Sequence, residues 1–234
     1  MTDWRPVAEM DWLRDIDNYC ERLAPGWAGE PLNALSNLAF VVAAVLLWRR
    51  LPARGESAAA LRGLAALVLA VGLASAVFHT TAQLWSAALD IGSIAIFIAA
   101  LLFFYCRRVM AWGRTGAAAG TLGFLAGMWL FERATAVALP KAWLNGSEAY
   151  LPALLGLLAM AWRLRGVTRP GARRLFAASA VLAAALLARS VDQHLCGVWP
   201  FGTHIFWHLL NGLTFYLAVD AMALATRASS GRVE

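Results

Sequence analysis

The sequence predicts an all-α membrane protein: a bundle of seven transmembrane helices, with its N-terminus outside and its C-terminus in the cytoplasm. Three observations lead to this prediction: an unusually apolar composition, seven apolar runs, and basic residues that alternate between loops. Of the 234 residues, 61% are hydrophobic and 15% are charged, whereas soluble domains are about half apolar and about a quarter charged. One small core cannot bury so much apolar surface, and a lipid bilayer is the solvent that suits it.

Seven apolar runs are expected to span the membrane as helices, because the strands of membrane barrels alternate apolar and polar residues instead. The runs cover residues 32–48, 61–81, 85–105, 117–131, 149–162, 175–189 and 204–225. The N-terminal segment is acidic and lacks the apolar core of a signal peptide. We therefore expect a polar N-terminal extension (1–31), one seven-helix domain that carries the candidate site (32–226) and a cytoplasmic tail (227–234).

The distribution of basic residues sets the expected orientation of the bundle. Fourteen of the twenty Lys and Arg residues lie beside the ends of the first, third, fifth and seventh runs, and the other six lie on the opposite side. Cytoplasmic segments carry the excess of basic residues, so the N-terminus is expected outside. Since the arginines form short clusters between apolar runs, no nucleic-acid partner is expected.

Five polar residues are expected at similar depth, near the outer ends of three helices. Ser75 and His79 lie one turn apart on the second helix, and Asp90 lies near the start of the third, after a short loop. His204 and His208 lie one turn apart at the start of the seventh helix, so their side chains share one face. Ionisable groups inside a membrane are costly and usually mark a functional site.

These residue types are suited to a catalytic zinc site. Three imidazoles leave the fourth position of tetrahedral zinc open for water, and an i, i+4 pair of histidines presents both rings to one ion. Asp90 is the candidate base, because no carboxylate lies between the two histidines of the pair. The alternatives are that each histidine is structural, and that Ser75 is a nucleophile or a small residue that permits close helix packing.

The pattern resembles the alkaline ceramidases, which belong to a superfamily of seven-helix intramembrane hydrolases that includes the adiponectin receptors. The resemblance runs from about Asp17 to the end of the seventh helix. Its motifs are Ser-x-x-x-His, an Asp eleven residues later, and His-x-x-x-His in the last helix. The segments that carry it are "DNYCERLAPGWAGEPLNALSNLAF", "SAVFHTT" and "GTHIFWHLL".

The resemblance implies a role for each residue of the candidate site. It implies that His79, His204 and His208 bind zinc and that Asp90 takes a proton from the water on the metal. Ser75 would support the geometry of the metal site or the developing oxyanion. The implied reaction is hydrolysis of the amide of ceramide to a sphingoid base and a fatty acid.

The acidic extension supplies a second candidate metal site, because calcium requires six to eight oxygen ligands. The resemblance implies calcium ligands at Asn18, the Tyr19 carbonyl, Glu21 and Glu30, with Asp17 as a further oxygen donor. The sequence departs from the animal enzymes at Leu23, where they offer Asn. The alternative is a solvated acidic extension without a metal.

The three cysteines divide between the two expected sides of the membrane. Cys20 and Cys196 both lie outside, where disulfides form if the protein is in a bacterial inner membrane, and the Ala- and Arg-rich composition is typical of bacteria. We expect a Cys20–Cys196 disulfide that holds the extension beside the seventh helix, as in the related family, and two free thiols are the alternative. Cys106 lies at the cytoplasmic end and is expected to be inert.

Several other polar residues are expected to be structural. Asn33, Ser36 and Asn37 support the site or cap the first helix, Arg189 and Asp192 form a pair, Asp220 is structural, and His194 is solvated.

Two classes of function remain after the sequence analysis. The first is a zinc-dependent amidohydrolase that acts on ceramide or on another N-acyl lipid taken from the bilayer, with its site toward the periplasm. The second is a seven-helix receptor or sensor in which zinc is structural.

Overall fold

The computed structural model describes residues 11–22, 24, 29–55, 57–139 and 144–230. Leu23 lies outside these ranges, and so do three of the basic residues counted above, Arg5, Lys141 and Arg232. The long elements of the described chain are helices, and an isolated β-bridge pairs Asp15 with Gln83. The α-helices are α1 (Pro31–Ser36), α2 (Leu38–Arg50), α3 (Ala58–Thr81), α4 (Leu84–Arg108), α5 (Arg114–Ala138), α6 (Leu151–Leu164), α7 (Arg169–Leu195) and α8 (His204–Ser230), and the 3-10 helix η2 (Ser147–Tyr150) precedes α6.

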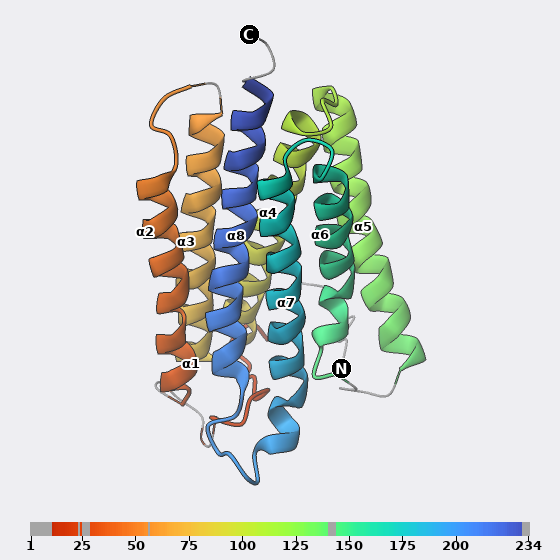
Figure 1. Cartoon of the computed structure of the whole chain (residues 1–234). Coiled ribbons are helices and arrows are strands. Elements are labelled where there is room, and N and C mark those ends of the chain that lie inside the picture. Colours follow the sequence, from red (N-terminus) through yellow and green to blue (C-terminus); the bar gives the residue numbers. More distant parts are fainter. Residues whose placement is uncertain (1–10, 23, 25–28, 56, 140–143, 231–234) are drawn as a thin grey trace.

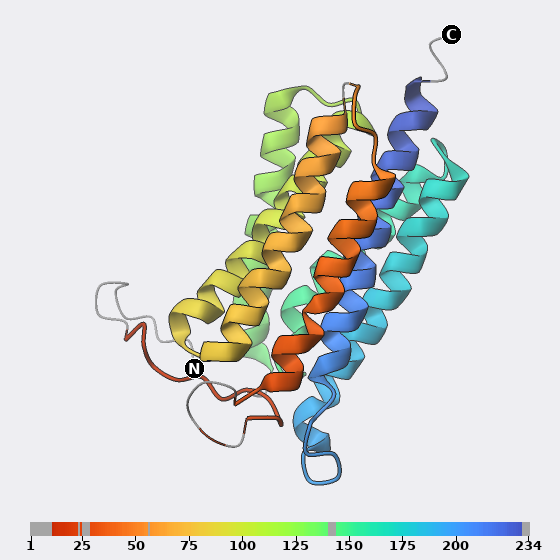
Figure 2. The ribbon, with the colours of Figure 1, turned by 90° about the vertical axis from the view of Figure 1, so that its left-hand side faces the viewer.

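The helices run alternately up and down along one bundle axis (Figures 1 and 2). Helices α1 and α2 follow each other along one rod, so the described chain crosses the bundle seven times, as predicted for an all-α bundle. Five of these crossings are long and apolar enough to span a membrane: Pro31–Arg50, Ala58–Thr81, Leu84–Arg108, Arg169–Leu195 and His204–Ala228. These helices fit an integral membrane protein. Helices α5 and α6 also form where apolar runs were predicted, and whether they span stays a prediction.

The helices extend beyond the apolar runs that predicted them. Helix α7 begins at Arg169 and α4 continues to Arg108, because arginine is a good helix former and its long side chain reaches away from the apolar layer. Similarly, α1 begins at Pro31 and α8 continues to Ser230, past the expected domain boundaries. Apolar composition located the helices, and helix propensity and packing decided where they end.

Helix α8 is the central packing element of the bundle. It packs against α2, α3 and α7, and its buried side chains include Ala218, Val219 and Met222. The carboxylate of Asp220, also on α8, is buried and pairs with Arg50 of α2 and Arg174 of α7 at 2.5 and 3.1 Å. The structural role expected for Asp220 is therefore confirmed: it joins three helices at the end of the bundle opposite the N-terminal extension.

The outer surface of the bundle is apolar, as contact with lipid requires. Large hydrophobic side chains are exposed along several helices, among them Leu35, Val42, Leu122, Leu155 and Leu187. Most of the basic residues lie at the end of the bundle where α2, α4, α6 and α8 finish (Figure 1). The membrane side that each end faces stays a prediction.

A tight corner between α3 and α4 places the candidate site near the N-terminal extension. Ala82 adopts a left-handed conformation with φ 44°, and Gln83 and Ser86 form a capping box that starts α4. The extension runs along this corner, where the Ile16 amide donates to the Ala82 carbonyl at 2.7 Å. The backbone of the extension thereby reaches the end of the bundle where α3 ends and α8 begins.

Candidate metal centre

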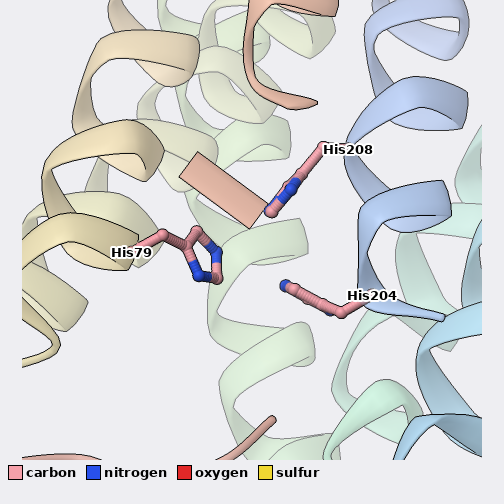
Figure 3. Close-up of side chains that lie close together, drawn as sticks. All are labelled: His79, His204 and His208. Atoms are coloured by element: carbon pink, nitrogen blue, oxygen red, sulfur yellow. The ribbon is translucent and has the colours of Figure 1, made fainter. Parts of the chain in front are cut away.

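Three buried histidines converge at the end of the bundle that carries the extension. His79 comes from the last turn of α3, and His204 and His208 come from the first two turns of α8 (Figure 3). Each is 1% exposed, and one nitrogen from each ring lies within 4.8 Å of the others. These are the three histidines that the sequence singled out, and together they could hold one metal ion.

The partners of the ring nitrogens fit a metal held between the rings. His79 Nδ1 lies 2.6 Å from a Glu30 carboxylate oxygen, and His208 Nδ1 lies 2.7 Å from the Ser36 hydroxyl. Histidines that ligate metals usually use their second nitrogen in this way, which fixes the ring orientation. His204 Nδ1 is buried and has no hydrogen-bond partner among the described residues, which is costly unless another group satisfies it. The set of three imidazoles with supporting partners suits zinc.

Ser75 and Asp90 lie beside this cluster. The Ser75 hydroxyl is 3.4 Å from His208 Nε2, and Ser75 and Asp90 line the same cavity. The Oδ1 atom of Asp90 is buried and has no hydrogen-bond partner in the part of the chain that the structure describes. The corner between α3 and α4 therefore presents a hydroxyl and a carboxylate to the same place as the histidines.

A largely apolar cavity of about 480 Å³ begins at these polar groups. Ser75, Asp90 and His208 line one end of the cavity, and Tyr105 and Met110 line the other. Because the lining includes Asp90, Leu101 and Tyr105 of α4, the cavity extends along roughly four turns of that helix. A volume of this size is typical of sites for small ligands, and its shape suits a long apolar chain.

A residue of the N-terminal extension, Tyr19, packs directly against the metal centre. The Tyr19 ring stacks on His204, with ring centroids 3.6 Å apart. Burial raises the pKa of the Tyr19 hydroxyl, although the positive charge of Arg189 acts in the opposite direction, so this residue stays neutral. Tyr19 therefore contributes a buried aromatic face, in addition to the backbone carbonyl for which the sequence singled it out.

Asp192 fixes the start of α8. One of its carboxylate oxygens accepts from the Thr203 and His204 amides at 2.6 and 2.9 Å, and the other accepts from the Cys20 amide at 3.1 Å. Gly202 precedes this turn with φ 66°, and a Cβ there would overlap the Asp192 carboxylate. A pair between Arg189 and Asp192 was expected, but Asp192 instead satisfies backbone donors at the helix end, where four amides lack partners within the helix.

The predicted disulfide between Cys20 and Cys196 is confirmed. It joins the extension to the segment between α7 and α8, across 176 positions of sequence. Cys106 is buried and free, as expected. The bond therefore holds Tyr19 and its neighbours against the helix that carries two of the histidines.

Removal of this disulfide should destabilise the protein measurably. We expect Cys196→Ser to lower the free energy of unfolding by about 2–4 kcal/mol, because the cross-link restricts a long loop of the unfolded chain. Thermal unfolding of the purified protein in detergent measures the change, with Cys106→Ala as the control for loss of a thiol outside the bond. Unchanged stability of Cys196→Ser in the absence of reductant would contradict the prediction.

The residues expected to bind calcium have other partners. Both Glu21 oxygens accept from the Leu32 and Asn33 amides at the start of α1. Asp17 and Asn18 are exposed, and the Asn18 and Tyr19 carbonyls accept from the Gln193 side chain and the Arg22 amide. Among the described residues, the acidic side chains of this segment form no group of three that could hold a metal ion, and the calcium site stays a prediction from the sequence.

Glu30 belongs to the histidine cluster. It is 1% exposed and accepts from Arg22, Asn33 and His79. Burial alone would raise the pKa of this carboxyl, but the hydrogen bonds from His79 and Arg22 outweigh burial and lower the pKa. Glu30 is thus a charged partner of a candidate metal ligand.

Sequence reasoning missed three supporting contacts: Glu30 with His79, Ser36 with His208, and Asp192 with the start of α8. The polar residues at the start of the first helix were a partial signal for Ser36. No local pattern indicates the other two contacts, since each joins segments far apart in the chain.

Comparison with known proteins gives one family. The family described as Ceramidase matches residues 17–233, which is nearly the whole chain. No curated protein matches the sequence. The match begins in the extension and includes every residue of the metal centre described above. The chain therefore belongs to the ceramidase family.

Proposed function

We propose that this protein is a zinc-dependent intramembrane amidohydrolase that cleaves ceramide to a sphingoid base and a fatty acid. One observation carries the proposal: His208 belongs to a cluster of three histidines and also lines, with Ser75 and Asp90, a largely apolar cavity. Family membership supports hydrolysis of a lipid amide. The zinc, the substrate and the catalytic roles are the parts that we propose.

An amide is a weak electrophile and water is a weak nucleophile at neutral pH, so both need activation. When bound, zinc would lower the pKa of a water ligand to about 7 and polarise the amide carbonyl. His79, His204 and His208 would hold the metal, and the contacts from Glu30 and Ser36 would orient His79 and His208.

Asp90 is positioned to move the proton during hydrolysis. Its buried, unpartnered Oδ1 can accept a proton from the attacking water. Asp90 then returns the proton to the amide nitrogen as the C–N bond breaks, which is general acid–base catalysis. The Ser75 hydroxyl lies beside His208 and can donate to the developing oxyanion.

The cavity supports a lipid with a long apolar chain. Its polar end lies at the histidine cluster and its walls are otherwise mainly aromatic and aliphatic, including Phe97, Leu101 and Trp207. An acyl chain can lie along the cavity while its amide group reaches Ser75 and Asp90. Ceramide satisfies this requirement, and so does another N-acyl lipid.

We propose that the metal centre faces the outer side of a bacterial inner membrane. The distribution of basic residues assigns the extension to the outside. The Cys20–Cys196 disulfide belongs to the same end of the bundle, and such bonds persist in the oxidising periplasm.

A hydrolysis assay tests the proposed function. We expect the purified, zinc-loaded protein to release fatty acid from ceramide in detergent micelles, with an ornithine-type N-acyl lipid assayed in parallel. Protein stripped of zinc is the control and should be inactive until zinc is restored. Fully loaded protein that cleaves no long-chain lipid amide would contradict the proposal and favour a receptor with a structural zinc.

A further inference from the structure

A buried ion pair lies directly behind the metal centre, in the segment where a calcium site was expected. Arg22 Nε lies 2.7 Å from Glu30 Oε1, and the two side chains are only 3% and 1% exposed. Arg22 Nη1 donates to the Ala24 carbonyl at 3.4 Å. Gly29 packs against the guanidinium, and a Cβ there would lie 3.1 Å from Arg22 Nη1. The absence of a side chain at Gly29 thus leaves the room that the guanidinium occupies.

The carboxylates of this segment do not fit calcium. Calcium requires six to eight oxygens that face one point. Both Glu21 oxygens accept backbone amides of α1 at 2.6 and 2.8 Å. Glu30 gives one oxygen to Arg22 and the other to Asn33 and His79. The cation that faces Glu30 in this chain is the side chain of Arg22.

The positive charge of a guanidinium can neutralise a buried carboxylate as a bound metal cation would. A buried carboxylate requires a charged partner, since burial of an isolated charge is very costly. The guanidinium of an arginine is in effect a permanent cation in proteins. Glu30 therefore remains an anion, and an anion at this position orients the His79 ring through Nδ1 and strengthens it as a ligand.

We propose that Arg22 replaces calcium in this chain: its guanidinium holds Glu30 against His79, so the metal centre needs no calcium. Arg22 and Glu30 are positioning residues, because they act on the metal through His79. The inference rests on the proposed metal centre but not on the lipid that is cleaved.

The first experiment uses the unaltered protein. Purified protein in detergent, in buffer depleted of calcium by a chelating resin and resupplied with zinc, is titrated with calcium up to 1 mM (about the affinity of weak extracellular sites). We expect no saturable change in melting temperature and no bound calcium in equilibrium dialysis. Saturable calcium binding that stabilises the protein would overturn the proposal.

The second experiment measures zinc affinity in variants by competition with a chromophoric chelator. We expect Arg22→Gln and Glu30→Gln each to weaken zinc binding by about 10- to 100-fold, as loss of a ligand's outer partner does. The double variant should bind no more weakly than Glu30→Gln, because both changes break one connected path. Arg22→Lys keeps the charge and should retain most of the zinc affinity. It is the variant to measure if Arg22→Gln folds poorly.

Arg14→Gln is the matched control, because Arg14 is an exposed arginine of the same extension, and it should bind zinc normally. Wild-type zinc affinity in folded Arg22→Gln would overturn the proposal. Neither experiment measures hydrolysis, so a protein with no lipid amidase activity can still confirm the role of Arg22. Conversely, an active enzyme that needs calcium would refute the proposed role of Arg22 but not the proposed hydrolase function.

Discussion

Replacement of His208 by alanine should remove zinc and lipid amidase activity together. His208 supplies one of three imidazoles whose ligand atoms lie within 4.8 Å of one another, and two remaining histidines do not complete the usual three-ligand catalytic site. Loss of the metal removes several kcal/mol of transition-state stabilisation, which corresponds to about a thousandfold or more in rate. Zinc content of the purified variant and fatty-acid release from ceramide measure the two effects.

His194→Ala is the control for this prediction. His194 is exposed at the end of α7 and lies outside the histidine cluster, so its replacement should change neither zinc content nor activity. A His208→Ala protein that keeps one zinc per chain would show that the ligand set is wrong. If that protein has also lost activity, His208 acts in catalysis and is not a zinc ligand.

Replacement of Asp90 by asparagine should separate metal binding from catalysis. The side chain keeps its size, but it can no longer take a proton from water. We expect the rate to fall by about 10²- to 10⁴-fold, the range for loss of a general acid–base group. Zinc content should stay unchanged, because Asp90 is not part of the histidine cluster.

The matched control for Asp90→Asn is Asp11→Asn, since Asp11 is an exposed aspartate of the extension and is not among the residues predicted to bind calcium. This control should retain wild-type activity and zinc. If Asp90→Asn also retains wild-type turnover with zinc bound, another group must carry the proton and the assigned role of Asp90 fails.

Most of the bundle could be predicted because its causes are local. Long apolar runs require lipid and a helical backbone, and this places α3, α4, α7 and α8 without any knowledge of their neighbours. Helix periodicity also places His204 beside His208 and Ser75 beside His79, since residues four apart share a face. The meeting of α3 with α8 was inferred from depth alone, and the structure shows the contact.

The assignment of the acidic residues could not be predicted in the same way. Glu30 was grouped with Glu21 as an oxygen donor for calcium, because carboxylates close in sequence are natural partners for a hard cation. In the structure, Glu21 turns to the amides of α1 and Glu30 turns to His79 and Arg22. The competing donors come from the start of the first helix, from α3 and from a neighbouring arginine.

The sequence by itself determined that this is a helical membrane protein with three histidines, a serine and an aspartate at one depth, and that Cys20 and Cys196 can meet. Only the tertiary structure decided which groups surround those histidines: Glu30 behind His79, Ser36 behind His208 and Tyr19 across His204. The physical reason is the separation along the chain of the residues that interact. Hydropathy and helical spacing act along the chain, whereas a buried charge takes whichever donor the folded chain brings within about 3 Å.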